Sequence, residues 1–514
     1  MDNLPNRIDN FLTKVFSDFK PVNRGSKVIH DPLWGSNLFY PWEIAIIDSP
    51  LFQRLRRIHQ TGTAYFTYPS SSHSRFCHSL GVTILADKLL HTLKEKVKVK
   101  GNNKLISDKD IYEVRLAGLV HDFGHCFFSH TSEQVLENLA FFNKLKQKYP
   151  EFGKKKIAPH EIFAYFILTN NLFKKFWEKN IESMFRRTKD IPELENIARI
   201  IIKSSDIPPQ KRFLREIITG PYDVDKLEYL YRDGYNAGLN IAYDIERYFY
   251  KINVEDVSRY TKIPGEHRLV MDFTGITVVE QLIFSKMMLY SYIYHHQKVR
   301  AADCLIRDIV VEIISRNDLE IRIKSPFDLL NYTDYDILSC FISGGKSKFN
   351  GLVKKLQNRY LLKRCFVINR DYVEGLKTDE EVAGKYESLC EDMRDVLKSQ
   401  LKMRQEILER INKRSRKKYD LTDVYIDLPP VPPIEEAAKA PIKLPNGKIE
   451  PMSDYFQLEG WQKTYELKKL RGYFFVNPTI IDLANKEIRD YLREKYNLSF
   501  SSLSSQLAKV IDGD

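Results

Sequence analysis

The chain has 514 residues, of which 43% are hydrophobic, and it contains 22 glycines and 22 prolines. This composition excludes a mainly disordered or collagen-like protein, and the length suggests about two to four globular domains. With 80 basic and 68 acidic residues the net charge is +12, which favours anionic partners such as nucleotides or nucleic acid without choosing between them.

The sequence shows no signal for export or membrane insertion. It has no run of about 18 apolar residues, and its first residues, MDNLPNRIDNFLTKVF, include acidic side chains and no uninterrupted apolar stretch. The 6 cysteines are scattered without a CxxC pair, which favours reduced thiols over a disulfide framework or a zinc ribbon. We therefore expect a cytoplasmic protein with no membrane partner.

Helical periodicity dominates the chain up to residue 300. After an amphipathic lead-in over residues 1–26, apolar residues recur at helical spacing from Ser79 to Leu93, and Ser107 with Asp110 resembles a capping box that opens a second helix. Further helical patterns cover residues 132–148, 160–178, 193–204, 224–237 and 276–300. These patterns predict a mainly α-helical core.

Short segments with β-strand propensity interrupt this helical pattern. Residues 252–273 predict a small hairpin, and residues 419–428 and 472–476 are rich enough in β-branched and aromatic side chains to form strands. The prolines at 429, 430, 432 and 433 impose an extended segment, which we place at 428–451. The expected fold is therefore mainly α, with small β elements and a mixed α/β C-terminal region over residues 306–514.

The stretch from Arg115 to His130, RLAGLVHDFGHCFFSH, concentrates candidate metal ligands behind an apolar run. On a helix, His121 and His125 would lie one turn apart on one face, with Asp122 three residues before His125, so one ion could meet nitrogen and oxygen donors together. Chance is the alternative, because a His-Asp pair should occur ~1 time in such a composition.

Further ligand candidates lie elsewhere in the chain. His78 stands in SHSRFCHSLGV, just before a predicted helix, and Asp225 stands in YDVDKLEYLYRDG, where Asp225, Tyr229 and Asp233 share one helical face. A set of two histidines and two aspartates suits Mn, Fe, Mg or Zn, and the residue types alone do not select one of them.

These motifs, in this order, resemble those of the HD-domain phosphohydrolase superfamily. RFCHSLGV is followed by HDFGHCFFSH, then PHE at 159–161, then DVDKLEYLYRDG, and the likeness extends from DSPLFQRLRRIHQTG at 48–62 to YHHQKVRAAD at 294–303. Within the superfamily the chain resembles the deoxynucleoside triphosphate triphosphohydrolases of the sterile-alpha-motif and HD-domain type, here without the sterile-alpha-motif domain. The resemblance implies an HD-domain catalytic core over residues 27–305 and a homo-oligomer.

The resemblance also implies residue roles. The metal ligands would be His78, His121, Asp122 and Asp225. His125 would be the family's catalytic histidine, Glu133 stands where relatives often have an orienting aspartate, and His160 would line the same pocket. Arg75, Lys226 and Tyr229 match triphosphate contacts, Gln60 and Asp233 match contacts to the sugar 3′-hydroxyl, and Tyr294 matches the aromatic ring under the sugar.

Two further departures from the family pattern stand out. Lys286 occupies a position where relatives often have arginine, which replaces bidentate phosphate binding by a point charge. Trp34 replaces the histidine of the family's DPxHG stretch. His130 follows two phenylalanines and a serine, and we expect it to pack or cap a helix.

The implied reaction is metal-dependent hydrolysis of a deoxynucleoside triphosphate at the α-phosphorus, releasing deoxynucleoside and triphosphate, with a second Mg²⁺ on the triphosphate left open. Basic side chains would offset phosphate charge, and His125 would protonate the leaving oxygen. Two alternatives remain. One is an HD phosphohydrolase acting on another nucleotide or phosphoester. The other is a nucleic-acid-binding protein with a regulatory or weakly active pocket, for which the cluster KRSRKK at 413–418 would supply basic charge.

A regulatory site is a further expectation from the resemblance. The positions that read an activating nucleotide in the regulated branch of the family correspond to Lys27, Val28, Asp48, Gln53 and Arg56. The alternative for residues 48–58 is a buried helix whose arginines pair with carboxylates.

Overall fold

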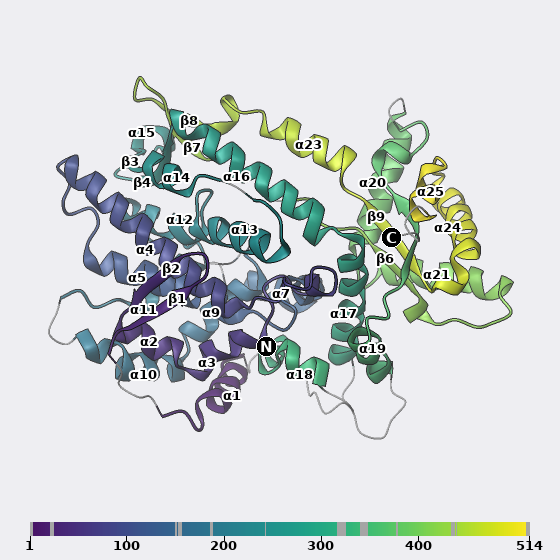
Figure 1. Cartoon of the computed structure of the whole chain (residues 1–514), viewed down its shortest axis with the longest axis horizontal. Helices are drawn as coiled ribbons and strands as arrows, with labels where there is room; N and C mark the ends of the chain where they lie inside the picture. The colour runs from purple at the N-terminus through teal and green to yellow at the C-terminus, as the bar shows by residue number, and fades with distance from the viewer. Residues whose placement is uncertain are drawn as a thin grey trace.

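The structure is a computed structural model, and it describes residues 4–20, 25–149, 152, 157–185, 189–241, 243–315, 325–339, 348–376, 379–432, 437 and 439–509. A large helical body carries a smaller mixed α/β body at one side (Figure 1). The protein is therefore mainly α-helical with small sheets, as the sequence predicts. Among the helices of the described ranges, none is both long and apolar enough to cross a membrane.

The N-terminal segments pack onto the helical body. α1 (Leu4–Phe16) buries one apolar face in the main core, consistent with the predicted amphipathic lead-in. β1 (Lys27–Asp31) and β2 (Gly35–Phe39) form an antiparallel hairpin. The sequence did not predict this hairpin, because its turn carries none of the Asn-Gly or Asp-Gly signals of tight hairpins. α2 (Pro41–Ile47), α3 (Pro50–Gln53) and the 3-10 turn η1 (Arg54–Arg57) follow.

Three helices form the frame around the candidate site. α4 (Arg75–Val99) packs against α5 (Asp108–Val120) and against α13 (Val224–Ala237). The predicted capping box opens α5, since Asp110 accepts the backbone N–H of Ser107 at 2.7 Å. α4 begins at Arg75, so His78 lies inside its first turn. The prediction that His78 precedes the helix is wrong, because the helix begins three residues earlier, at Arg75.

The other helices of this body are shorter than the periodicity predicts. The pattern over 132–148 is divided into α6 (His130–Glu137) and α7 (Ala140–Lys148), and that over 160–178 into α9 (Pro159–Leu168) and α10 (Asn171–Asn180). α11 (Leu194–Ile201), α12 (Arg212–Thr219), α14 (Ile245–Lys251), α16 (Ile276–Leu289) and α17 (Gln297–Ser315) follow, with a π-helical turn at Tyr290–Tyr294 before α17.

The predicted hairpin is confirmed and belongs to a larger sheet. β3 (Ile252–Asp256) pairs antiparallel with β4 (His267–Asp272), with the short helix α15 (Ser258–Thr261) between them. β7 (Pro441–Lys443) adds parallel to β4, and β8 (Ile449–Pro451) closes the order β3-β4-β7-β8. Part of the predicted extended segment is therefore sheet. Residues 433–436 and 438 of that segment lie outside the described residues.

The mixed α/β body has its own hydrophobic core. Its sheet has the order β5-β9-β6, built from β5 (Lys363–Ile368), β9 (Gly472–Val476) and β6 (Val424–Asp427). β6 and β9 confirm the two predicted strands, and β5 was missed. α20 (Glu380–Arg394), α21 (Ser399–Arg414), α24 (Ile481–Tyr496) and α25 (Leu503–Lys509) pack against this sheet, while α18 (Asp334–Ser339), α19 (Lys348–Gln357) and α23 (Leu458–Lys468) lie toward the helical body (Figure 1).

A buried ionic cluster joins the two bodies. α17 runs across residue 305, where the sequence predicts a domain boundary, and contacts β6. Asp427 of β6 accepts two hydrogen bonds from Arg300, at 2.8 and 2.7 Å, and one from Arg307 at 2.7 Å. All three side chains are buried. The division of the chain at this point remains a prediction.

We predict that Asp427→Ala destabilises the protein by about 3–5 kcal/mol, because it removes the carboxylate that two buried guanidinium groups share, although Arg300 keeps its pair with Asp303. Denaturant unfolding measures this loss. Glu381→Ala is the control, since the Glu381 side chain is 76% exposed and its pair with Lys385 is a surface contact. A loss below about 1 kcal/mol for Asp427→Ala would contradict the assigned role of the cluster.

Candidate metal centre

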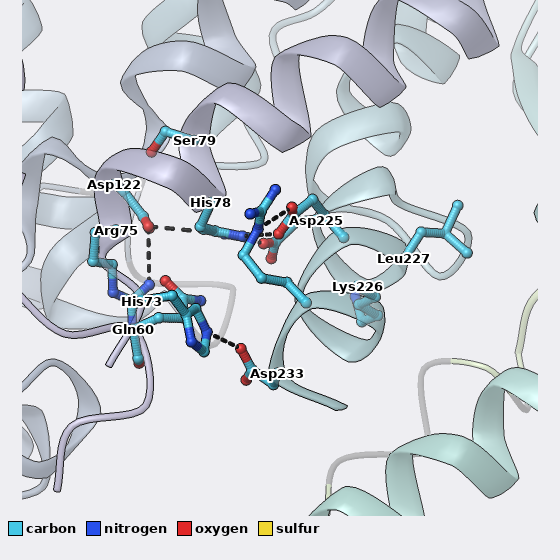
Figure 2. A network of polar contacts seen from close by, with 12 residues as sticks. Gln60, His73, Arg75, His78, Ser79, Asp122, Asp225, Lys226, Leu227 and Asp233 are labelled. Carbon is cyan, nitrogen blue, oxygen red and sulfur yellow. Dashed lines mark hydrogen bonds and ion pairs between the residues drawn. The ribbon is translucent and has the colours of Figure 1, made fainter. Parts of the chain in front are cut away.

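The four predicted metal ligands converge from three separate segments. His78 comes from the first turn of α4, His121 and Asp122 from the 3-10 turn η3 (His121–Gly124), and Asp225 from the first turn of α13. His78 Nε2 lies 2.9 Å from Asp225 Oδ1 and 3.8 Å from Asp122 Oδ2. His121 Nε2 lies 3.3 Å from Asp122 Oδ1 and 3.8 Å from Asp225 Oδ1. Figure 2 shows His78 between the two carboxylates.

The local backbone differs from the prediction that His121 and His125 share one helical face. α5 ends at Val120, and the 3-10 turn ends at His125, whose ψ of 133° is extended. Gly124 explains the tight turn, because a Cβ there would collide with the His160 carbonyl and lie 2.7 Å from the backbone nitrogen of Ala164. The glycine thus lets α9 approach, and the His125 and His160 rings stack at 4.0 Å.

The donor set fits a divalent or transition metal. His121 Nδ1 donates to the Gly118 carbonyl at 2.8 Å, whereas its buried Nε2 has no hydrogen-bond partner among the described residues and faces the carboxylates. His78, His121 and Asp122 are buried, and Asp225 is 33% exposed, so the centre opens on the Asp225 side. Nitrogen and oxygen donors of this kind suit Mn, Fe, Mg or Zn.

The charges at the centre favour a cation. Burial alone would lower the pKa of His78, but hydrogen bonds to Asp225 and Glu228 outweigh it and raise the pKa to about 10. Burial would raise the pKa of Asp122, but Arg75 and His121 hold it well below its usual range. The raised pKa of His78 reports the negative charge of the carboxylates beside it, which a bound metal ion would neutralise, and the lowered pKa of Asp122 keeps that ligand ionised.

Arg75 connects the metal centre to the turn that follows it. Its Nη1 donates to Asp122 Oδ2 at 2.9 Å and its Nε donates to Ser129 Oγ at 3.0 Å. The guanidinium group therefore lies beside a predicted metal ligand.

The predicted catalytic residues form a second cluster beside the first. His160 Nδ1 lies 2.6 Å from Glu133 Oε1, and His125 Nδ1 lies 3.7 Å from the same oxygen. His130 Nδ1 lies 2.7 Å from Glu133 Oε2, and its side chain is 65% exposed. His130 thus also belongs to this cluster. Its spacing of three residues from Glu133 on one helix was the sequence signal that could have placed it there.

The pKa values of the residues in this cluster are shifted in different directions. Burial, reinforced by Arg75 and His160, lowers the pKa of His125 well below its usual value. Burial would lower the pKa of His160 as well, but the Glu133 carboxylate raises it to about 9. Burial would raise the pKa of Glu133, but the His160 and His125 rings hold it well below its usual range. Glu133 and His160 therefore form a buried ion pair.

The residues predicted to hold the sugar also lie together. Asp233 contacts His73 Nε2 at 2.7 Å (Figure 2) and accepts a hydrogen bond from the Tyr294 hydroxyl. Gln60 is buried, and its Oε1 has no hydrogen-bond partner among the described residues. His73 was not predicted, because no sequence signal separates it from the serines around it.

The residues predicted to hold phosphate lie on two neighbouring helices. Lys226 and Tyr229 are on α13, and Lys286 is buried on α16, which packs against α13. Lys226 donates to the Gly220 carbonyl at 2.9 Å.

The five predicted regulatory residues occupy one surface region built by β1, the end of α2, α3 and η1. Lys27 Nζ lies 2.9 Å from Asp48, and Arg56 donates to Gln53 at 2.8 Å. Gln53 donates to the Ile47 carbonyl at 2.7 Å, which brings the two pairs together, and Val28 is exposed. Nucleotide binding at this region remains a prediction.

Two histidines and two aspartates that converge within a helical domain are typical of a class of metal-binding proteins. The family described as HD domain matches residues 75–216, which contain three of the four ligands, and the HD associated region matches residues 260–458. The chain belongs to the HD-domain family.

Similar proteins include an uncharacterized protein of Methanocaldococcus jannaschii, 29% identical over 66% of this chain and 59% of the relative. Deoxynucleoside triphosphate triphosphohydrolase SAMHD1 of Homo sapiens is 29% identical over 59% of this chain and 48% of the relative. The SAMHD1 homolog of Dictyostelium discoideum is 26% identical over 73% of this chain and 65% of the relative. In each comparison the chain spans less than two thirds of the relative's own length.

We predict that Glu133→Gln lowers the pKa of His160 from about 9 to about 6.5 or below, because the carboxylate that stabilises the imidazolium is removed. NMR titration of the histidine ring measures the shift. In the wild type, the stability that His160 contributes is complete below about pH 6.5 and is lost as the pH rises through about 9. An unchanged His160 pKa in the variant would contradict the ion pair.

Proposed function

We propose that this protein is a metal-dependent hydrolase that cleaves deoxynucleoside triphosphates into deoxynucleoside and inorganic triphosphate. The observation that carries the proposal is the convergence of His78, His121, Asp122 and Asp225, whose facing atoms lie 2.9–3.8 Å apart. Membership of the HD-domain family and similarity to proteins named as triphosphohydrolases support the substrate class.

The four residues would hold one Mn, Fe, Mg or Zn ion, which when bound activates water for attack and offsets charge on phosphate. Arg75 lies beside Asp122, and we assign its guanidinium to binding a phosphate oxygen, as the family resemblance implies. Lys226, which pairs with Asp223 in this structure, and Lys286 lie on the neighbouring helices α13 and α16, and together with Arg75 they would favour a polyphosphate over a single phosphoester. A substrate with three phosphates would thus be bound along α13.

The second cluster is suited to proton transfer. The leaving deoxynucleoside oxygen needs a proton when the bond between the α-phosphorus and that oxygen breaks. The resemblance implies that His125 protonates this oxygen, but His125 contacts Asp122 and both of its ring nitrogens are buried, so we propose instead that it orients the metal ligand Asp122. His130 is exposed and is held by Glu133, so it is the member of the cluster that can reach a leaving group. Glu133 Oε2, 2.7 Å from Nδ1 of His130, would hold the orientation of this ring.

The sugar preference follows from Tyr294. Its hydroxyl donates to Asp233, which fixes the ring beside the group predicted to bind the 3′-hydroxyl. The family resemblance implies that this ring lies under the sugar, where a 2′-hydroxyl would clash. We therefore propose selectivity for deoxyribose.

Two further proposals rest on the family resemblance alone. One is that the protein forms a homo-oligomer, and the other is that a nucleotide bound at the region of Lys27 and Asp48 activates it.

The test is a substrate panel with purified protein, Mn²⁺ or Mg²⁺, and each deoxynucleoside and ribonucleoside triphosphate, with and without dGTP as activator. We expect equal amounts of deoxynucleoside and triphosphate from the deoxy substrates and at least about 10-fold slower turnover of the ribo substrates, a difference that corresponds to about 1.4 kcal/mol in the barrier.

His121→Ala should abolish both bound metal and turnover, because it removes a ligand from the centre. His91→Ala is the matched control, since His91 lies on the surface of the same helix as His78 with 59% of its side chain exposed. Nucleoside monophosphate with pyrophosphate as the products would instead support the alternative of another HD phosphohydrolase. Tight oligonucleotide binding without any turnover would support the nucleic-acid-binding alternative.

A further inference from the structure

Glu228 is a buried carboxylate that the proposed reaction does not use. It lies on α13 three residues after Asp225 and is fully buried. Its Oε2 lies 2.6 Å from Nδ1 of His78, on the side of the ring opposite the metal centre. Its Oε1 accepts hydrogen bonds from the indole Nε1 of Trp34 at 3.0 Å and from Nε of Arg232 at 2.5 Å.

These partners fix the direction of each hydrogen bond. The Trp34 indole and the Arg232 guanidinium are donors only, and the Glu228 carboxylate is an acceptor. His78 therefore presents a protonated Nδ1 to Glu228 and directs Nε2 toward Asp122 and Asp225. Arg232 is in turn held by Asp31 at 2.8 Å, which anchors the whole chain of contacts in the β1–β2 hairpin.

The main chain of α4 is shaped to admit this carboxylate. Gly81 lies three residues after His78, and a Cβ there would collide with Glu228 Oε1 and lie 2.6 Å from its Cδ. Any side chain at this position would push Glu228 away from His78. This steric requirement explains the glycine in the segment RFCHSLGV.

We propose that Glu228 is a positioning residue that sets the affinity of the metal centre by holding the His78 ring, with Trp34 and Gly81 keeping its carboxylate in place. The inference rests on the proposed function only in taking His78 as a metal ligand. Residues that hold the second nitrogen of a metal-binding histidine typically contribute 10–100-fold to metal affinity. Trp34, which departs from the family's histidine, retains the N–H donor that this arrangement needs.

The test measures Mn²⁺ affinity of the full chain by calorimetry, together with the visible spectrum of the Co²⁺-substituted protein. Glu228→Gln has nearly the same shape, but its amide N–H₂ would face the donors of His78, Trp34 or Arg232. We expect its Mn²⁺ affinity to fall about 10–100-fold and its Co²⁺ spectrum to shift, because His78 is no longer held. The fold should persist, since Arg232 keeps Asp31.

Gly81→Ala should produce the same loss without changing any polar group, because its Cβ displaces the carboxylate. Gly384→Ala is the matched control, since Gly384 also lies inside a helix, α20, and a Cβ there meets nothing within 4 Å. If folded Glu228→Gln and Gly81→Ala keep the wild-type Mn²⁺ affinity and Co²⁺ spectrum, this inference is wrong and the proposed function is unaffected. Wild-type protein that binds no Mn²⁺ would overturn the metal-dependent function and the inference together.

Discussion

The arrangement depends on two carboxylates, Asp122 and Asp225, which both lie at the Nε2 edge of the buried His78 imidazole. Placing two negative charges this close together in a poorly solvated position is unfavourable unless a cation or a proton compensates them. The packing of α4 against α5 and α13 enforces this closeness, because each helix contributes its end or its first turn to the same point. The fold therefore leaves an excess of negative charge at this point. A divalent metal ion would neutralise it, and the guanidinium of Arg75 already lies beside Asp122.

The C-terminal region takes part in shaping the turn between His125 and His130. Phe128 and Ser129 both have positive φ, of 53° and 50°, which is strained for residues other than glycine. Asp334 of α18 accepts the N–H of Phe128 at 2.6 Å and of His59 at 2.8 Å. Arg54 donates to the carbonyls of His125 and Leu330, each at 2.7 Å. Segments from both sides of residue 305 therefore hold the turn that presents His130 and Glu133.

Local patterns in the sequence predicted those features that depend on neighbouring residues. The bounds of α13, the capping box at Ser107, the β3–β4 hairpin and the strands β6 and β9 follow from spacing and residue type. The ligand set required the order of several motifs, since a single His-Asp pair was uninformative. Features set by contacts between distant segments were missed: the hydrogen bond from Trp34 to Glu228, the pairing of β7 with β4, and the approach of α9 that ends the helix before His121. Nothing in the periodicity around these residues encodes their partners.

The central claim is that water attacks the α-phosphorus and that the bond to the deoxynucleoside oxygen breaks. Hydrolysis of dGTP in ¹⁸O-labelled water, followed by mass spectrometry of the products, tests it directly. We expect one ¹⁸O atom in the released triphosphate and none in the deoxyguanosine. Label in the deoxyguanosine would show attack at carbon, and label in a nucleoside monophosphate would show pyrophosphate release, and either result would contradict the account.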